Sequence, residues 1–327
     1  MVNFEAYLRK QKQPLEGALR HALSGNSGAP PVLAEAMRHA VMNGGKRLRP
    51  ALLLASAAAY GLPEKKAMPA ACAFELTHCF SLVHDDLPAL DNDALRRGKP
   101  TVHTLYGEAT ALLAGDALLI AAFGLMARLT VPPARALRAC ALLAQAAGAA
   151  GMTGGQTADL FAEGLPRESR RLKQLKKTGA EGAKHPLSFY LLPGGKTAPE
   201  KILRYIHLHK TAAMLAAPLE AGAALAGAPY SELAHLRAFG LDCGLAFQIS
   251  DDILDVSGDK GRLGKRGSDR DNDKLTYASL YGLEPSRKMV YSLLARAKKR
   301  LAGLKKADNK KLGPLYGLAD FLAARNY

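Results

Sequence analysis

Two clusters of aspartates, each at the end of an apolar segment, limit what this chain can fold into more than any other feature. The six carboxylates are Asp85, Asp86, Asp91, Asp251, Asp252 and Asp255. In the second cluster, Asp251 and Asp255 are four residues apart and therefore share one face of a helix. Gln248 and Asp252 lie on the adjoining row. Stacked carboxylates repel one another unless a cation lies between them, and oxygen-only clusters suit Mg²⁺. The pattern therefore predicts helices with acidic ends that hold Mg²⁺.

The first cluster requires a bend in the chain. Asp85 and Asp91 are six residues apart, which does not place them on one helical face. Pro88 lies between them and should end or bend the helix, so that Asp91 returns to the side of Asp85. Arg96 and Arg97 follow, and guanidinium groups bind phosphate through paired hydrogen bonds. The stretch predicts a binding site for a metal ion and a diphosphate. The alternative is a solvated helix end with mixed charges.

Further motifs occur in the order found in the trans-isoprenyl diphosphate synthase (polyprenyl synthetase) family, and the chain most resembles the bacterial farnesyl diphosphate synthases. Besides the DDxxxxD and DDxxD clusters, these motifs are GGKRLRP at 44–50, RRGKPT at 96–101, GGQTADL at 154–160, HKT at 209–211 and GKR at 264–266. Each motif alone is moderate support for the resemblance, and their shared order makes it strong.

The resemblance implies an all-α isoprenoid synthase fold, with about ten or more helices around a deep central cavity and the acidic helices facing each other at its mouth. It implies one domain over residues 1–327 and a homodimer. The implied reaction is head-to-tail prenyl transfer that depends on Mg²⁺, with three ions per active site. Isopentenyl diphosphate is joined to dimethylallyl or geranyl diphosphate, which gives farnesyl diphosphate and diphosphate.

The resemblance also assigns roles to single residues. The six aspartates of the two clusters are the implied metal ligands. Lys46, Arg49, His78 and Arg97 are implied to bind isopentenyl diphosphate. Arg96, Lys210 and Lys265 are implied to bind the allylic diphosphate, and Thr211, Gln248 and Lys274 are further implied substrate-binding residues. Arg96, Lys210 and Lys265 are also implied to stabilise the leaving diphosphate together with the metal ions. The spacing from Lys265 to Lys274 departs from the family's pattern.

Phe80, five residues before Asp85, is implied to form the floor of the cavity that holds the growing chain. A bulky ring there favours a product of fifteen carbons, and the alternative is a geranylgeranyl diphosphate synthase. A class I terpene cyclase is a weaker alternative, because cyclases steer cations with aromatic faces and aromatic residues make up only 6% of this chain. A non-catalytic synthase subunit would typically lack one acidic cluster, and this chain has both.

The formal charge of +16 raises the question of nucleic acid or membrane partners. The excess lies in residues 167–184 and 287–311, and neither segment interleaves aromatic with basic residues as a stacking platform would. We therefore expect solvated surfaces and no nucleic acid partner. The four cysteines lie in apolar runs without metal-like spacing, which indicates buried thiols in a reducing compartment.

The N-terminal residues lack an apolar signal core, and no run of eighteen uncharged apolar residues indicates a membrane span. These features predict a cytoplasmic protein without stable membrane insertion. Apolar periodicity predicts long helices over 66–86, 107–127, 133–162 and 199–225.

One segment, at about 165–199, is longer than the family's usual turn. It passes from a basic to a Gly/Pro-rich stretch. Two hypotheses remain for it: an electrostatic cap beside the active-site mouth, or a decoration of the surface.

Overall fold

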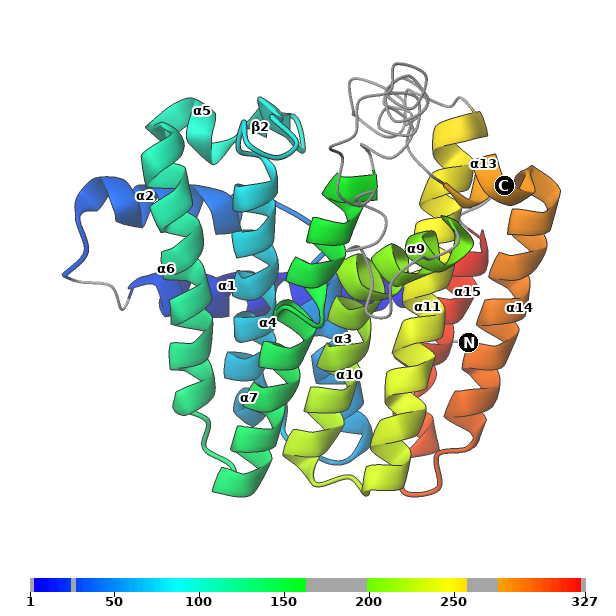
Figure 1. Ribbon diagram of the computed structural model, residues 1–327. Helices are drawn as coiled ribbons and strands as arrows, with labels where there is room; N and C mark the ends of the chain where they lie inside the picture. Colours follow the sequence, from blue (N-terminus) through cyan, green and yellow to red (C-terminus); the bar gives the residue numbers. More distant parts are fainter. Residues whose placement is uncertain (1–2, 25–27, 163–198, 258–275, 325–327) are drawn as a thin grey trace, which may run out of the picture.

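The computed structural model describes residues 3–24, 28–162, 199–257 and 276–324, and in these residues the chain is almost entirely helical (Figure 1). The predicted all-α isoprenoid synthase fold is confirmed. Residues 165–198 of the long segment lie outside the described residues, as do Lys265 and Lys274.

The helices α1 to α7 are Phe4–Ser24, Pro31–Met42, Leu48–Ala59, Glu64–Asp85, Val102–Tyr106, Glu108–Ala127 and Pro133–Ala147. After them come α9 (Pro199–Ile206), α10 (Ala213–Ala226), α11 (Tyr230–Ser257), α13 (Tyr277–Tyr281), α14 (Leu283–Ala302) and α15 (Gly313–Ala324). A π-helical segment, η2 (His207–Ala212), joins α9 to α10, and a 3-10 turn, η3 (Asn309–Lys311), precedes α15. A short antiparallel hairpin consists of β1 (Leu95–Arg96) and β2 (Lys99–Pro100).

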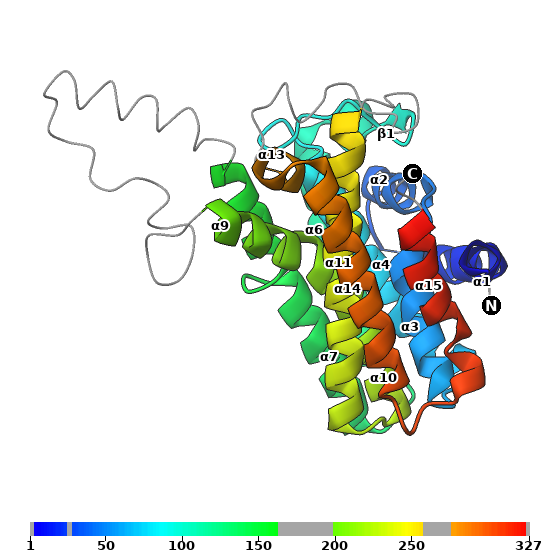
Figure 2. The same cartoon turned by 90° about the vertical axis from the view of Figure 1, so that its right-hand side faces the viewer.

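Helix α10 lies at the centre of the bundle. Every residue from Met214 to Leu225 is buried, and the helix packs against α3, α7 and α11. Five of these twelve residues are alanine and one is glycine, and such small side chains let neighbouring helices approach closely on several sides. Helices α1 and α2 lie crosswise to the long helices, so that α1 runs horizontally in Figure 1 and is seen end-on in Figure 2. The bundle therefore has one almost completely buried helix at its centre.

The C-terminal ends of α4 and α11 lie at the same end of the bundle (Figure 1). Helix α4 ends at Asp85, shortly before Pro88, as the proline predicts. Both aspartate clusters therefore reach the same rim of the molecule, where the β1–β2 hairpin and the helical residues 152–162 also lie.

Two of the predicted helices are interrupted. The helix expected over 133–162 stops at Ala147, and a second helical stretch occupies 152–162. The helix expected over 199–225 contains the π-helical segment η2, in which each turn takes up an extra residue. Apolar periodicity does not reveal such breaks, because alanine- and leucine-rich sequence continues across them.

A buried ion pair joins the start of α3 to α4. Arg47 has a positive φ of 51° at the N-terminal end of α3, and its guanidinium donates to Glu75 at 2.8 Å and to the Val41 carbonyl at 2.6 Å. Both side chains are almost fully buried. A buried charge without its partner costs about 3–5 kcal/mol, so this pair fixes how the GGKRLRP loop enters the bundle.

Candidate active site

The end of α4 and the loop after it bring the first acidic cluster together. The Asp91 amide donates to the Asp85 carbonyl at 2.8 Å, so the chain turns back as the proline predicts. Asp86 is buried and accepts from Arg96 at 2.5 Å, and Asp93 accepts from the same guanidinium at 3.2 Å. Arg96 therefore braces the loop through two carboxylates.

Burial raises the pKa of Asp85 to about 6, an effect opposed by Lys210 and Arg96 and reinforced by Asp91 and Asp86. Burial likewise raises the pKa of Asp86 to about 6, against the opposing effect of Arg96. A cation beside Asp85 would relieve both the desolvation and the repulsion between these carboxylates. The chemistry of this cluster therefore fits a hard divalent ion.

A cavity of about 350 Å³ opens beside this cluster. Asp85 lines it together with Phe80 and His84, which lie on the same face of α4. From the other side it is lined by residues of the broken helix and of η2, namely Met152, Thr153, Gln156, Thr157, Leu160, Lys210 and Thr211. Charged side chains and a larger number of apolar ones thus line the same cavity.

Arg49 and His78 also line this cavity. The Arg49 Nε is buried and has no hydrogen-bond partner among the described residues. Burial holds the pKa of His78 well below its usual range, and the positive charges of Arg49 and Arg97 lower it further. The imidazole is therefore neutral. A guanidinium whose buried Nε lacks a partner among the described residues, beside a neutral histidine, is suited to an anionic group such as a phosphate.

The two other basic residues predicted for this region lie apart from the cavity. Arg97 donates to the Gly44 carbonyl, and a Cβ on Gly45, whose φ is +123°, would meet the guanidinium at 2.6 Å. Only glycine permits this approach. Lys46 is exposed, and its ammonium lies 5.9 Å from the centre of the Phe321 ring of α15. Arg96 and Arg97 line a smaller neighbouring cavity that also includes Asp86.

The π-helical segment η2 contacts both the helical residues 152–162 and α11. Lys210 forms an ion pair with Asp159, and Thr211 donates to Gln248 of α11 at 2.8 Å. The broken helix packs very closely here, because a Cβ on Gly155 would lie 2.2 Å from the Lys210 amide nitrogen. The glycines of the GGQTADL motif therefore serve a close approach of two segments.

The second acidic cluster lies on the last turns of α11. Asp252 is buried; its carboxylate accepts from the Tyr277 amide at 2.9 Å and lies 3.8 Å from the His207 Nε2. Asp252 thus fixes the start of α13. Asp251 and Asp255 are half-buried. Within the described residues, no three carboxylate, histidine or cysteine side chains converge closely enough to hold a metal ion by themselves. Mg²⁺ commonly takes waters and substrate phosphates as its other ligands.

Residues 30–310 match the family described as polyprenyl synthetase. The chain belongs to the polyprenyl synthetase family. It is 42% identical to a dimethylallyltranstransferase of Fischerella ambigua, over 99% of this chain and 84% of that protein. It is 38% identical to a farnesyl diphosphate synthase of Geobacillus stearothermophilus, over 100% of this chain and 99% of that one. The predicted reaction class, prenyl transfer, is confirmed.

Solved structures give the same result for the fold of this polyprenyl synthetase. The crystal structure of an FPP/GFPP synthase from Zymomonas mobilis superposes with a TM-score of 0.75 at 30% identity, covering 98% of this chain and 99% of that one. A geranylgeranyl pyrophosphate synthase of Capsicum annuum is 40% identical over 99% of this chain and 79% of its own length. The relatives therefore include enzymes of different product length.

Two features of this polyprenyl synthetase were not apparent from its sequence. Arg47, between Lys46 and Arg49, is a structural residue paired with Glu75. The π-helical segment that positions Lys210 and Thr211 has no signal in the sequence HLHKTA. π-Helical turns frequently occur at functional sites, but they are recognised from backbone hydrogen bonds.

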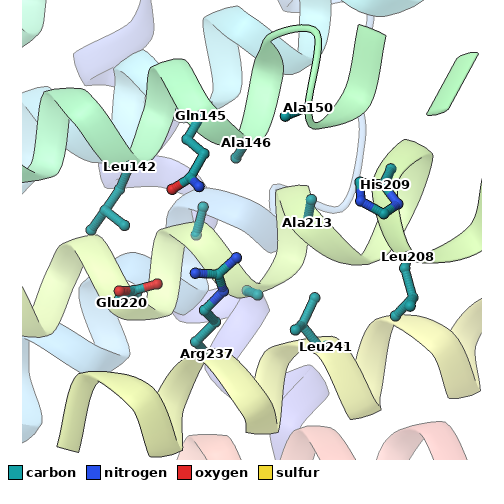
Figure 3. A pocket seen from close by; sticks show the side chains of 12 residues that line it. Leu142, Gln145, Ala146, Ala150, Leu208, His209, Ala213, Glu220, Arg237 and Leu241 are labelled. Carbon is teal, nitrogen blue, oxygen red and sulfur yellow. The ribbon is translucent and has the colours of Figure 1, made fainter. Parts of the chain in front are cut away.

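A second cavity of the polyprenyl synthetase, of about 170 Å³, lies between α7, α10 and α11 (Figure 3). Arg237 and Gln145 point toward each other across it, with Glu220 alongside. Leu208 and His209 line this cavity, whereas the next two residues of η2 line the larger one. Segment η2 is therefore a wall shared by two cavities.

The raised pKa values of Asp85 and Asp86 predict a pH-dependent stability for the metal-free polyprenyl synthetase. An exposed aspartate has a pKa of about 3.9, so the folded protein binds these protons more tightly than the unfolded chain. The stability contributed by these groups is complete below about pH 4 and is lost as the pH rises through about 6.

Asp85→Asn should therefore raise the melting temperature of the metal-free protein relative to the parent at about pH 7.5, and much less at about pH 4. Glu35→Gln, at an exposed carboxylate of α2, is the matched control. An equal change at both pH values in the Asp85 variant would contradict the assignment.

Proposed function

We propose that this polyprenyl synthetase condenses isopentenyl diphosphate with dimethylallyl or geranyl diphosphate to give farnesyl diphosphate. The observation that carries the proposal is the content of one cavity. This cavity is lined by Asp85 and Lys210, by Arg49 and the neutral His78, and by Phe80. Groups suited to two diphosphates and an apolar space for a hydrocarbon chain are thus contiguous.

The allylic diphosphate binds at the rim between α4 and α11 in this proposal. The aspartates of the two clusters hold Mg²⁺ there, with Asp85 and Asp91 on one side and Asp251 and Asp255 on the other. Asp86 and Asp252 fix the surrounding chain through Arg96 and the Tyr277 amide. Three Mg²⁺ ions held by these aspartates would neutralise charge on the diphosphate while its bond to carbon breaks. Lys210 donates to the same leaving group, for which it must exchange its present partner Asp159.

Isopentenyl diphosphate binds with its diphosphate on Arg49. His78, held neutral, donates one hydrogen bond without adding to the positive charge. The double bond attacks the allylic cation formed when the C–O bond breaks, and a proton then passes to the departed diphosphate. Water would trap the cation, and the apolar residues Leu82, Leu90, Met152 and Leu160 of the cavity wall exclude it.

A geranylgeranyl diphosphate synthase is the second candidate. The name of the Capsicum annuum relative favours it, and so do several others of similar identity. Phe80 argues against a geranylgeranyl product, because its ring takes up space in the cavity that Asp85 also lines. Because a fifteen-carbon chain needs less depth than a twenty-carbon one, we favour the farnesyl product.

We also propose a homodimer formed through α6. Of the described helices, α6 alone is long and apolar enough to cross a membrane by length and composition. However, Ala111, Ala114 and Leu118 are buried in the bundle, so α6 is part of the core. Its other face exposes Leu112, Leu113 and Ile120, the last at 70%. An exposed apolar face of this kind is typical of an interface, and a two-fold axis would let one copy cover the same face of another.

Alanine in place of Asp85 or Asp251 should reduce turnover at least about a hundredfold, which corresponds to about 3 kcal/mol of lost transition-state stabilisation. The reason is that charge on the leaving diphosphate would lack a bound cation. Steady-state assays with isopentenyl and geranyl diphosphates at saturating Mg²⁺ measure this. Glu35→Ala is the control, and turnover close to the parent's in both aspartate variants would refute the mechanism.

Phe80→Ala should lengthen the product, because removing the ring deepens the cavity by the volume of a side chain that the hydrocarbon can fill. Chromatography of the dephosphorylated products measures chain length. Phe161→Ala, at a 43% exposed ring outside the cavity, is the matched control. An active, folded Phe80 variant with the parent's product profile would show that Phe80 is not the floor.

Ile120→Glu should dissociate the proposed dimer, since two buried carboxylates would face the interface without partners. Sedimentation equilibrium should give the mass of two chains for the parent and of one for the variant. Tyr291→Glu, which places the same charge at a 48% exposed side chain of α14, should leave the mass unchanged. A parent protein with the mass of one chain would contradict the proposed dimer.

A further inference from the structure

We propose that His84 of α4 and Gly115 of α6 together set the depth of the product cavity, because they fix the position of the Phe80 ring. This proposal rests on the proposed formation of farnesyl diphosphate, with Phe80 as the floor of the cavity, and deepens it. It makes His84 a specificity-determining residue, and Gly115 a positioning residue that acts through His84. The helix pair α4–α6, rather than Phe80 alone, would then decide product length.

The two rings are in direct contact. Phe80 and His84 are four residues apart on α4, and their ring centres lie 5.0 Å apart at an interplanar angle of 78°. This edge-to-face packing is a favourable arrangement of aromatic rings. Both side chains line the cavity that also contains Asp85. A shift of the imidazole is therefore transmitted to the floor of the cavity.

The imidazole of His84 also contacts helix α6. The His84 Nε2 lies 3.0 Å from the Leu112 carbonyl and 3.7 Å from Asp116 Oδ1. Between these two residues, Gly115 leaves room for the ring: a Cβ at this position would lie only 2.2 Å from Nε2 and 2.4 Å from Cδ2. Even one methyl group at residue 115 must displace the imidazole.

The direction of that displacement follows from the surroundings. The backbone and side chains of α6 occupy one side of the imidazole, and the cavity lies on another. A methyl group on α6 therefore pushes the ring away from α6, toward Phe80 and the cavity. The space for the end of the hydrocarbon becomes shorter, and elongation should stop earlier.

The experiment compares product lengths of the full-length protein with isopentenyl and dimethylallyl diphosphates and Mg²⁺. Gly115→Ala should shift the products toward shorter chains, so that the ratio of ten-carbon to fifteen-carbon product rises at least about fivefold. His84→Ala should shift them toward longer chains. Gly124→Ala is the matched control on the same helix, since a Cβ there has nothing within 4 Å, and it should keep the parent's products.

The double variant His84→Ala/Gly115→Ala tests whether the glycine acts through the histidine. Once the ring is absent, the added methyl group has nothing to displace, so the products should equal those of His84→Ala alone. A merely structural role of Gly115 would change the melting temperature or total turnover without this dependence of chain length on residue 84.

The outcomes separate this proposal from the function on which it rests. If the parent forms no prenyl product, the proposed function is wrong. If the parent is active and Gly115→Ala keeps its product profile, the proposal is overturned. Should Gly115→Ala fail to fold, as its melting curve would reveal, an unchanged product profile in active His84→Ala overturns it instead.

Discussion

Charged groups withdrawn from water at the mouth of an apolar cavity are the constraint on which the rest of this structure depends. The raised pKa values of Asp85 and Asp86 show the cost of that withdrawal. An unpaired buried charge is costly, and the fold supplies a partner for three of the charged groups: Arg96 for Asp86, Asp159 for Lys210 and Glu75 for Arg47. The arrangement of the rim follows from these pairs.

Interruptions of regular helix bring those partners within reach. Segment η2 turns Lys210 and Thr211 toward one cavity and Leu208 and His209 toward another. The break after Ala147 redirects the next helical residues, so that Gly155 can pack on the backbone of η2. Continuous α-helices in both places would have kept the helical period and turned these side chains to other faces.

Neighbouring residues of the same type have different tasks in this site. Arg47 is buried against Glu75, whereas Arg49, two residues later, has a buried Nε without a partner among the described residues and lines the cavity. Asp86 binds Arg96, while Asp85 lines the cavity. Asp252 fixes α13, one residue after Asp251. In each pair one side chain is held by a contact with another segment, and the other is the one that we propose binds a substrate or its metal ions.

The sequence by itself determined the all-α fold, the reaction class, the end of α4 before Pro88 and the return of Asp91 to Asp85, because periodicity, proline and motif order are local signals. Only the tertiary structure decided which of two neighbouring aspartates or arginines is held by a contact with another segment. It also decided where the helices break, and that His84 lies between Phe80 and Gly115. These outcomes depend on contacts between segments far apart in the chain. A spacing rule relates residues only to their neighbours on one helix, so it cannot say which distant backbone atom or charge a side chain will meet.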